Sequence, residues 1–543
     1  MRILMVAAEN DGIEHCKVGG IGDVVRDTPR ALAAMGVETV VATPSHGRLR
    51  SKTKIWQSPF LIADAPIEVF EMPARRPDAR IRHLSIHHPS LASPGGKIYY
   101  DDPKDRPFSS DASKFASFSR AVALAIQAGV FGKVDCLHLH DWHTAFLLIL
   151  RKYHPVFRPL QSIRAAYTIH NLSLQGVRPF LGEESSLRSW YLDLDFSWAH
   201  LHSNREVLGD LADPRWPHCV NPMAAGIRLA DAVHAVSPSY AEEILQPSDP
   251  ANGFFGGEGL EGALMDARPR LFGILNGCDY PEARVGPTMD RAELFNLFRD
   301  QAAQWLSPHL LAYHRLTETK PAKLAPKVLL TTVTRVVAQK LRLLREPTSS
   351  GQPALEAILS FLGKRGLYVL EGTGAPEYEA FLSSMSARHP NFVFLNGYSE
   401  EVGSALYANG DIFIMPSSFE PCGISQMLAL RDGQPCVVHS VGGLRDTIQD
   451  GVNGFAFTGR TSREQADNFV AACKKAIELK LDRPEEWKTI QDKARASRFL
   501  WKDSVEQYLA KLYGMPPVAP EVKAEMVKPK ASPPAVAADV SRL

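Results

Sequence analysis

Residues 411–428 read DIFIMPSSFEPCGISQML, and the rest of the sequence is best interpreted outward from this stretch. The apolar run 412–415 predicts a buried parallel strand. After a short turn comes Glu420, and Pro421 then suits the first position of a helix whose apolar spacing continues downstream. A carboxylate therefore lies at the carboxyl end of a sheet strand, where open α/β sheets bind ligands and helix amides favour phosphate. An ordinary turn in which Glu420 merely caps the helix is the competing interpretation.

The bulk composition describes a large globular protein with no polyanionic partner. A length of 543 residues favours two or more domains. The formal net charge of +1 gives no indication of nucleic acid or an anionic membrane surface as a partner. No run of 18 apolar residues predicts a membrane span, and the apolar stretch at the N-terminus is too short for a signal peptide. The seven cysteines form no C-x-x-C pair, which argues against a disulfide scaffold or structural zinc and for a reducing, cytoplasmic compartment.

The first 42 residues predict a strand, a glycine-rich loop, a helix and a second strand. The loop reads KVGGIGD at 17–23, between a strand at 2–7 and a helix that continues to Ala34. It lacks the third glycine of the G-x-G-x-x-G dinucleotide fingerprint. Lys17, just before the glycines, is a point cation that suits a phosphate. The unit is therefore a candidate phosphate site of a different kind from the dinucleotide one.

Histidines mark two predicted strand ends further along. The stretch CLHLHDWH at 136–143 puts His138 and His140 on one face of a strand. That spacing suits either a metal site or hydrogen-bonded core histidines, and we favour the core role because catalytic zinc wants three well-placed ligands. The stretch AAYTIHNLSLQG at 165–176 puts His170 at a strand end, where a neutral ring can donate a hydrogen bond to a ligand hydroxyl.

The second half opens with a predicted strand at 327–333, followed by TRVVAQK at 334–340. Arg335 and Lys340 follow the strand end, where two fixed cations suit a diphosphate, although loop cations are often only solvated. Later strand ends carry EGTG at 371–374, Tyr398, and VGGLRDT at 441–447, whose glycines offer amides to phosphate.

These motifs together resemble the bacterial glycogen synthases and plant starch synthases. FEPCGISQM resembles that family's E-P-C-G-L-T-Q, KVGGIGDV its K-[TV]-G-G-L-[AG]-D-V, and HLHDWH its H-x-H-D-W-H. TIHNLSLQG, GILNGCD at 273–279, TRVVAQK and EGTG resemble its T-[IV]-H-N-L-x-x-Q-G, G-I-L-N-G-[IV]-D, S-R-L-x-x-Q-K-G and L-G-T-G. About nine such motifs occur in the family's order over residues 1–513, and one motif alone would be a weak indication.

The resemblance implies an α/β protein of the GT-B fold, with two facing Rossmann-like domains, an interdomain cleft and a C-terminal crossover helix. We expect an N-terminal domain at 1–280, a linker at 281–326 and a nucleotide-sugar-binding domain at 327–495. A crossover helix at 496–513 and a disordered tail at 514–543 follow; the sequence shows 487–513 as one helical, aromatic-rich stretch.

The resemblance also implies an activity: transfer of glucose from ADP-glucose to the non-reducing end of an α-1,4-glucan such as glycogen or a maltooligosaccharide, with retention and without a metal or other cofactor. The catalytic residues it implies are Glu420, Arg335, Lys340 and His170. The donor-binding residues are Lys17, Gly20, Asn276, Tyr398, Cys422, Gly423 and Ser425. Asp141 is implied on the acceptor side, and Tyr398 is expected to stack on adenine.

Four departures from the family pattern leave other functions open. Ala112, Ala224 and Leu341 replace an asparagine, a lysine and a glycine of the pattern, and the family's N-K-x-x-L-Q is missing from the linker. If position 341 needs a positive φ, Leu341 would be strained. The alternatives are a GT-B transferase with another donor, such as UDP-glucose, or a short acceptor, and a non-catalytic glucan-binding homologue. No pattern in the sequence indicates an oligomeric state.

Overall fold

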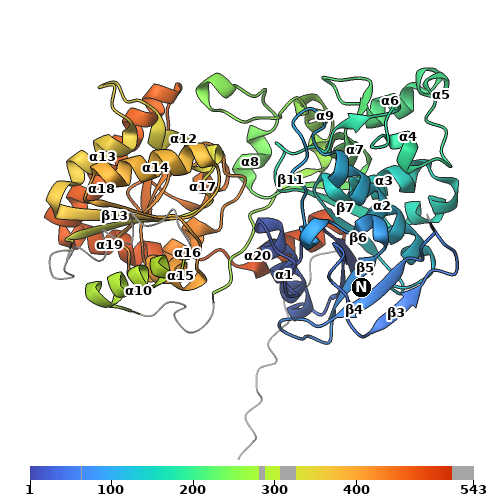
Figure 1. The fold of residues 1–543 in the computed structure, drawn as a ribbon, viewed down its shortest axis with the longest axis horizontal. Helices are drawn as coiled ribbons and strands as arrows, with labels where there is room; N and C mark the ends of the chain where they lie inside the picture. Colours follow the sequence, from blue (N-terminus) through green and yellow to red (C-terminus); the bar gives the residue numbers. More distant parts are fainter. Residues whose placement is uncertain (63, 281–287, 306–325, 516–543) are drawn as a thin grey trace, which may run out of the picture.

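The computed structural model describes residues 1–62, 64–280, 288–305 and 326–515, and Figure 1 shows two α/β domains side by side. The predicted disordered tail lies outside the described residues from position 516 on, as do 281–287 and 306–325 of the predicted linker. Each domain is built on one mainly parallel sheet with helices on both faces, which is the predicted fold class.

Within the described residues, the first domain holds a nine-stranded sheet of order β11-β10-β7-β6-β1-β2-β5-β4-β3. Its parallel core is buried on both faces, as the apolar runs of the sequence predict. The last two strands at one edge, β4 and β3, are antiparallel additions from the irregular region after β2. The strands are β1 (Arg2–Val6), β2 (Glu38–Pro44), β3 (Lys54–Gln57), β4 (Glu68–Met72), β5 (Ile81–His87), β6 (Cys136–His140), β7 (Arg164–Ile169), β10 (Ala232–Ala235) and β11 (Leu271–Gly273), and β8 (Arg178–Pro179) pairs separately with β9 (Cys219–Val220).

The second domain holds a six-stranded parallel sheet of order β14-β13-β12-β15-β16-β17 in the part of the chain that the structure describes. The strand predicted at 412–415 is confirmed as β15 (Ile412–Met415), which pairs with β12 and β16 in the middle of the sheet. The other strands are β12 (Val328–Val333), β13 (Gly366–Glu371), β14 (Phe392–Leu395), β16 (Cys436–His439) and β17 (Gly454–Phe457).

Helices cover both faces of each sheet (Figure 1). Those of the first domain are α1 (Gly20–Ala34), α2 (Ser109–Gln127), α3 (Trp142–Tyr153), α4 (Leu187–Trp190), α5 (Trp198–Ser203), α6 (Arg205–Leu211), α7 (Pro222–Leu229), α8 (Pro238–Glu243) and α9 (Glu261–Asp266). Those of the second are α10 (Arg291–Gln304), α12 (Ala338–Arg345), α13 (Ala354–Leu362), α14 (Pro376–Arg388), α15 (Glu400–Asn409), α16 (Ser425–Arg431), α17 (Gly442–Thr447), α18 (Ser462–Asp482) and α19 (Pro484–Ala496).

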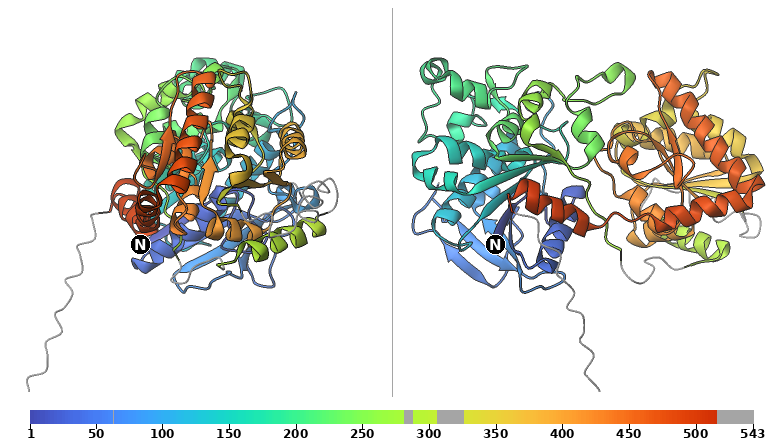
Figure 2. Two further views of the ribbon diagram at one scale, coloured as in Figure 1. Left: turned by 90° about the vertical axis from the view of Figure 1, so that its left-hand side faces the viewer. Right: turned by 180° about the vertical axis from the view of Figure 1, so that it is seen from behind.

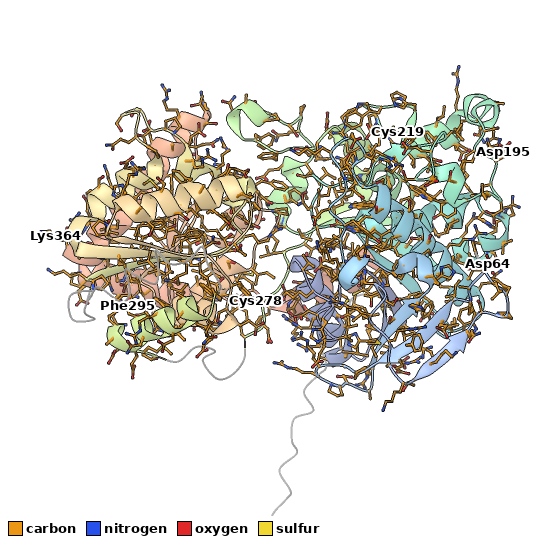
Figure 3. The ribbon with its side chains drawn as sticks, viewed as in Figure 1. Asp64, Asp195, Cys219, Cys278, Phe295 and Lys364 are labelled. Atoms are coloured by element: carbon orange, nitrogen blue, oxygen red, sulfur yellow. The ribbon has the colours of Figure 1, made fainter. Side chains whose placement is uncertain are left out.

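Within the described residues, two stretches of chain at the junction of the domains run side by side. Cys278, labelled between the domains in Figure 3, forms a parallel bridge with Leu500, and its amide donates to the Phe499 carbonyl at 2.7 Å. The predicted linker is not only a connection, because α10 packs Phe295 and Phe298 against the second sheet.

The prediction of a single helical stretch over 487–513 is wrong. The chain leaves helical conformation between Ser497 and Leu500, where Phe499 pairs with the stretch that holds Cys278. It then forms α20 (Trp501–Gln507) and the π-helical turn η8 (Tyr508–Leu512), which lie against the first domain (Figure 2). The extended break is needed because a continuous helix has no free amide or carbonyl to pair with a neighbouring stretch.

Two expectations from composition can be compared with the structure. All seven cysteines are free thiols, and the sequence had predicted no disulfide scaffold. Among the described residues, no helix combines the length and the apolar character that a membrane crossing requires.

Candidate active site

The loop after β15 holds Glu420 differently from the sequence prediction. Pro421 is not the first residue of a helix, because α16 begins only at Ser425. Gly423 intervenes with φ of 79°, a left-handed conformation that breaks the helical path and that glycine adopts without strain. Glu420 therefore does not cap α16, and the interpretation that it is merely a helix cap is wrong.

The Glu420 carboxylate binds Lys340 instead. The ammonium of Lys340 contacts Oε2 of Glu420, and the Ser417 hydroxyl donates to the same oxygen at 3.1 Å. Only 14% of the Lys340 side chain and 7% of the Glu420 side chain are exposed, so water screens this ion pair little. Two residues predicted as catalytic from motifs 80 positions apart thus meet at one edge of the second sheet.

Arg335 and Leu341 flank this ion pair in sequence. Arg335 follows β12 and is exposed, and its guanidinium makes no hydrogen bond or ion pair within the described part of the chain. Leu341 lies inside α12, is buried and packs in the core of the second domain. A helical residue has negative φ, so the strain considered for a leucine at this position is absent.

Residues on both sides of Glu420 contact the first domain. The Phe419 ring lies 5.5 Å from that of Tyr240, centroid to centroid, and the Ser237 hydroxyl donates to the Pro421 carbonyl at 2.6 Å. The Tyr240 hydroxyl in turn accepts the amide of Leu172 at 3.0 Å, two residues after His170. The Glu420 loop is thereby tied to the strand end that carries His170.

A second contact between the domains joins α8 to α17. The Ser239 hydroxyl and amide both donate to the Asp446 carboxylate, at 2.7 and 2.9 Å, and the Gly442 amide donates to Glu243 at 2.8 Å. Burial raises the pKa of Glu243 to about 7, and the Gly442 amide partly offsets this. The glycine amides expected to face phosphate are thus already used in part, because the Gly443 amide also donates to the Glu420 carbonyl.

The glycine-rich loop of the first domain is organised by a residue that the sequence reasoning missed. Buried Glu9 accepts the amides of Val18 and Gly19, both at 2.6 Å, and the Tyr99 hydroxyl at 2.7 Å. Gly20 begins α1, and a Cβ added there would meet no atom within 4 Å, so a ligand has room to approach. Glu9 could have been noticed because it is a carboxylate directly after a buried strand, whereas Tyr99 lies in an irregular region and carries no such signal.

Lys17 is held by carboxylates of its own domain. Its ammonium lies 2.6 Å from Asp23 and 3.7 Å from Asp11. The pKa of the Tyr398 hydroxyl, in the second domain, is raised by partial desolvation of this otherwise exposed side chain and by Glu400, and Lys17 opposes the rise.

His170 is placed by two groups at neighbouring strand ends. Its Nε2 lies 2.9 Å from Nδ1 of His140, and its amide donates to the Asp141 carboxylate at 2.7 Å. Burial lowers the pKa of His170 to about 3, so the ring is neutral and forms hydrogen bonds rather than ion pairs. Asp141 has φ of 54°, a strained conformation for a residue other than glycine, and burial raises the pKa of its carboxyl to about 7.

The core role favoured for His138 is confirmed. The hydrogen bonds around it determine which ring nitrogen of His138 and of His234 carries the proton. His234 Nε2 donates to the Ile274 carbonyl at 3.0 Å, so its Nδ1 accepts the Thr168 hydroxyl, also at 3.0 Å. The Thr168 oxygen then accepts from His138 Nε2 at 2.7 Å, and His138 Nδ1 accepts the Tyr513 hydroxyl at 2.9 Å. Both rings are neutral, since burial lowers the pKa of His234 to about 4 and holds that of His138 well below its usual range. No group of three or more His, Cys, Asp or Glu side chains placed to hold a metal occurs in the described ranges.

The remaining predicted donor residues come from three places: Asn276 follows β11 in the first domain, Tyr398 follows the edge strand β14, and Cys422 and Ser425 follow Glu420. Tyr398 is 64% exposed. Ser425 begins α16, and the buried Cys422 side chain packs in the hydrophobic cluster of the first domain. Burial raises the pKa of this thiol above its usual range, which keeps it protonated and unreactive. Cys422 thus joins the domains rather than supplying a nucleophile.

The fold and this site define a GT-B glycosyltransferase: two Rossmann-like domains meet at a buried lysine–carboxylate pair, with a neutral histidine tied to the same junction. Sucrose-phosphate synthase from Thermosynechococcus elongatus shares the fold, with a TM-score of 0.52 and 16% identity over 94% of this chain and 98% of that one. Residues 2–266 match the starch synthase catalytic domain, and residues 353–478 match glycosyl transferases group 1.

The chain belongs to the glycogen/starch synthase family and is a glucosyltransferase of that type. It is 31% identical to the glycogen synthase of Exiguobacterium sibiricum, over 93% of this chain and 97% of the relative. The glycogen synthase of Anaeromyxobacter dehalogenans is 32% identical, over 94% and 98%. The catalytic domain of starch synthase IV from Arabidopsis thaliana, solved with ADP and acarbose, superposes with a TM-score of 0.71 at 26% identity, over 94% and 98%.

Proposed function

We propose that this chain transfers glucose from ADP-glucose to the 4-hydroxyl at the non-reducing end of an α-1,4-glucan, with retention of configuration. The solved starch synthase IV, which carries ADP and the sugar acarbose, supports this donor and this acceptor class. The observation that carries the proposal is the contact between Lys340 and Glu420 at the edge of the second sheet that meets the first domain.

The leaving group in this reaction is a diphosphate, and the cations are arranged to receive it. Arg335 is exposed and unpaired among the described residues, while Lys340 and Lys17 are held by carboxylates that a phosphate can replace. Fixed cations stabilise the charge that develops on the departing phosphate oxygens. The room at Gly20, the Gly423 amide and the Ser425 hydroxyl add neutral contacts on either side.

The sugar would lie between Glu420 and His170. When the diphosphate takes Lys340, the Glu420 carboxylate is released to bind sugar hydroxyls and to stabilise positive charge at the anomeric carbon. His170, neutral and fixed by His140, hydrogen-bonds the 6-hydroxyl, and Asp141 holds the His170 amide on the acceptor side. Tyr398 stacks on the adenine. Asn276 lies on the first-domain side of the diphosphate, and Cys422 packs against that domain behind it.

The test is incorporation of radiolabelled glucose into glycogen from ADP-glucose and, in parallel, from UDP-glucose. We expect ADP-glucose to be the better donor, a product that an α-1,4-specific amylase digests, and loss of turnover in Glu420→Gln but not in the exposed-carboxylate control Glu401→Gln. Preference for UDP-glucose would overturn the donor assignment. ADP binding without any turnover would show a non-catalytic homologue instead.

A further inference from the structure

Glu371 is a buried acid at a position where the family pattern has leucine. It is the last residue of β13 and begins the EGTG stretch that resembles L-G-T-G. Its side chain lies inside the second domain at the carboxyl edge of the sheet, and the residue is 0% exposed. A carboxyl group in a place that accommodates an apolar side chain calls for a physical reason.

The Glu371 carboxyl contacts the loop that follows the neighbouring strand β14 and leads into α15. Oε1 accepts the Ser399 amide at 2.8 Å. Oε2 is buried and has no hydrogen-bond partner within the described part of the chain. It lies against Gly403 of α15, where an added Cβ would approach it to 3.3 Å, so a larger residue would crowd the carboxyl. The buried carboxyl therefore makes a single hydrogen bond with its side chain in the described residues, to the Ser399 amide.

Keeping an acid there is costly for the folded state. Burial raises the pKa of Glu371 to about 8, and the Ser399 amide only partly offsets this. Leucine would fill the same space without a desolvation penalty and without an unpaired oxygen. Stability alone therefore selects against glutamate, which points to a role in the site.

The corner that Glu371 holds carries Tyr398. On the other side of Tyr398, Gly397 packs against the indole of Trp305, where an added Cβ would lie 2.5 Å from Cδ2. Ser399 also accepts the Val402 amide at the start of α15. The backbone is thus fixed immediately before and immediately after a tyrosine whose own side chain is largely exposed.

We propose that Glu371 is a positioning residue that fixes the 397–399 corner, so that the Tyr398 ring is held ready for the nucleobase of the donor. This inference rests on the proposed function, in which Tyr398 stacks on adenine. The carboxyl touches neither the base nor the reacting atoms; it acts through the Ser399 amide. A preorganised ring loses less conformational freedom on binding, so the benefit appears as donor affinity and not as chemical rate.

Two substitutions separate this role from a structural one. Glu371→Gln keeps an oxygen that accepts the Ser399 amide, and Glu371→Leu introduces the family's residue and removes that acceptor. We expect Glu371→Leu to raise the Kd for ADP and the KM for ADP-glucose about five- to tenfold, with kcat within threefold of the parent; one neutral hydrogen bond sets this scale. Glu371→Gln should stay within twofold of the parent in Kd and KM at pH 7.

Inorganic pyrophosphate serves as a probe that carries the diphosphate but lacks the nucleobase. Its inhibition constant should be the same in all three proteins, because the corner contacts the base and not the diphosphate. An unchanged Kd for ADP in Glu371→Leu, an equal loss in Glu371→Gln, or a parallel loss of pyrophosphate affinity would each overturn the inference. Failure of the parent protein to bind ADP would instead refute the proposed function. Thermal unfolding of each variant checks that the fold is retained, and we expect Glu371→Leu to unfold no earlier than the parent.

Discussion

Glu420→Gln should make this protein bind ADP more tightly while it turns over far more slowly. The substitution keeps the shape of the side chain and removes its charge. In the structure, the Glu420 carboxylate holds the Lys340 ammonium and accepts the Ser417 hydroxyl. A diphosphate that approaches Lys340 must first displace this carboxylate, so binding and catalysis place opposite demands on Glu420.

The size of each effect follows from the burial of the ion pair. Two unit charges 4 Å apart attract by about 4 kcal/mol at an effective dielectric constant of about 20, the value suited to partly buried pairs. The incoming phosphate regains most of this attraction with Lys340. We expect a residual gain of about 1 kcal/mol, or roughly fivefold tighter ADP binding. Loss of a preorganised charge beside the anomeric carbon should lower kcat by about two to three decades.

Three measurements on the same preparations decide the matter. Calorimetric titration with ADP gives the affinity, radiolabelled incorporation into glycogen gives kcat, and thermal unfolding reports stability. Stability should fall by about 1–3 kcal/mol, because an amide replaces the charged partner of a buried lysine. Glu401→Gln, on the exposed face of α15, is the matched control and should change none of the three. Weaker ADP binding, or a kcat within tenfold of the parent, would refute the reasoning.

Four further expectations follow from individual contacts. Arg335→Ala should weaken ADP binding about tenfold or more without shifting the unfolding temperature, because an exposed guanidinium with no partner in the described residues gives little to stability; a lower unfolding temperature in differential scanning fluorimetry would contradict this. Asp141→Asn should flatten the pH dependence of kcat/KM for the glucan near pH 7, where the carboxyl of the parent changes from neutral below to ionised above; an unaltered pH–rate profile would count against it. Tyr513→Phe should lower the free energy of unfolding by about 1–2 kcal/mol, since the acceptor nitrogen of His138 loses its donor, with kcat unchanged; equal stability in urea titrations would argue that the nitrogen finds another donor. Glu371→Gln should gain stability over the parent as pH rises from about 5 to about 8, because the acid is neutral when folded up to a pKa of about 8 but ionised when unfolded above its ordinary 4.5; unfolding at the two pH values with no widening gap would refute it.

The sequence determined the kind of fold and singled out candidate residues at the strand ends. Apolar runs such as 412–415 specify buried parallel strands by composition alone, and carboxylates or cations placed directly after them must lie at the same edge of a sheet. Local spacing was therefore enough to single out Lys340, Glu420 and His170. It was wrong in placing a helix start at Pro421, because Gly423 can adopt either sign of φ and the sequence does not say that it takes the left-handed one that delays α16.

Only the tertiary structure decided which groups touch. Pairing across 80 residues brings Lys340 to Glu420, and pairing across 30 brings His140 to His170. Glu9 occupies loop amides that look free in the sequence. Hydrogen bonds and ion pairs act over a few ångströms, and distances of that size depend on how the whole chain packs. For this reason the sequence named the candidate residues, and the folded chain alone determined which groups each of them contacts.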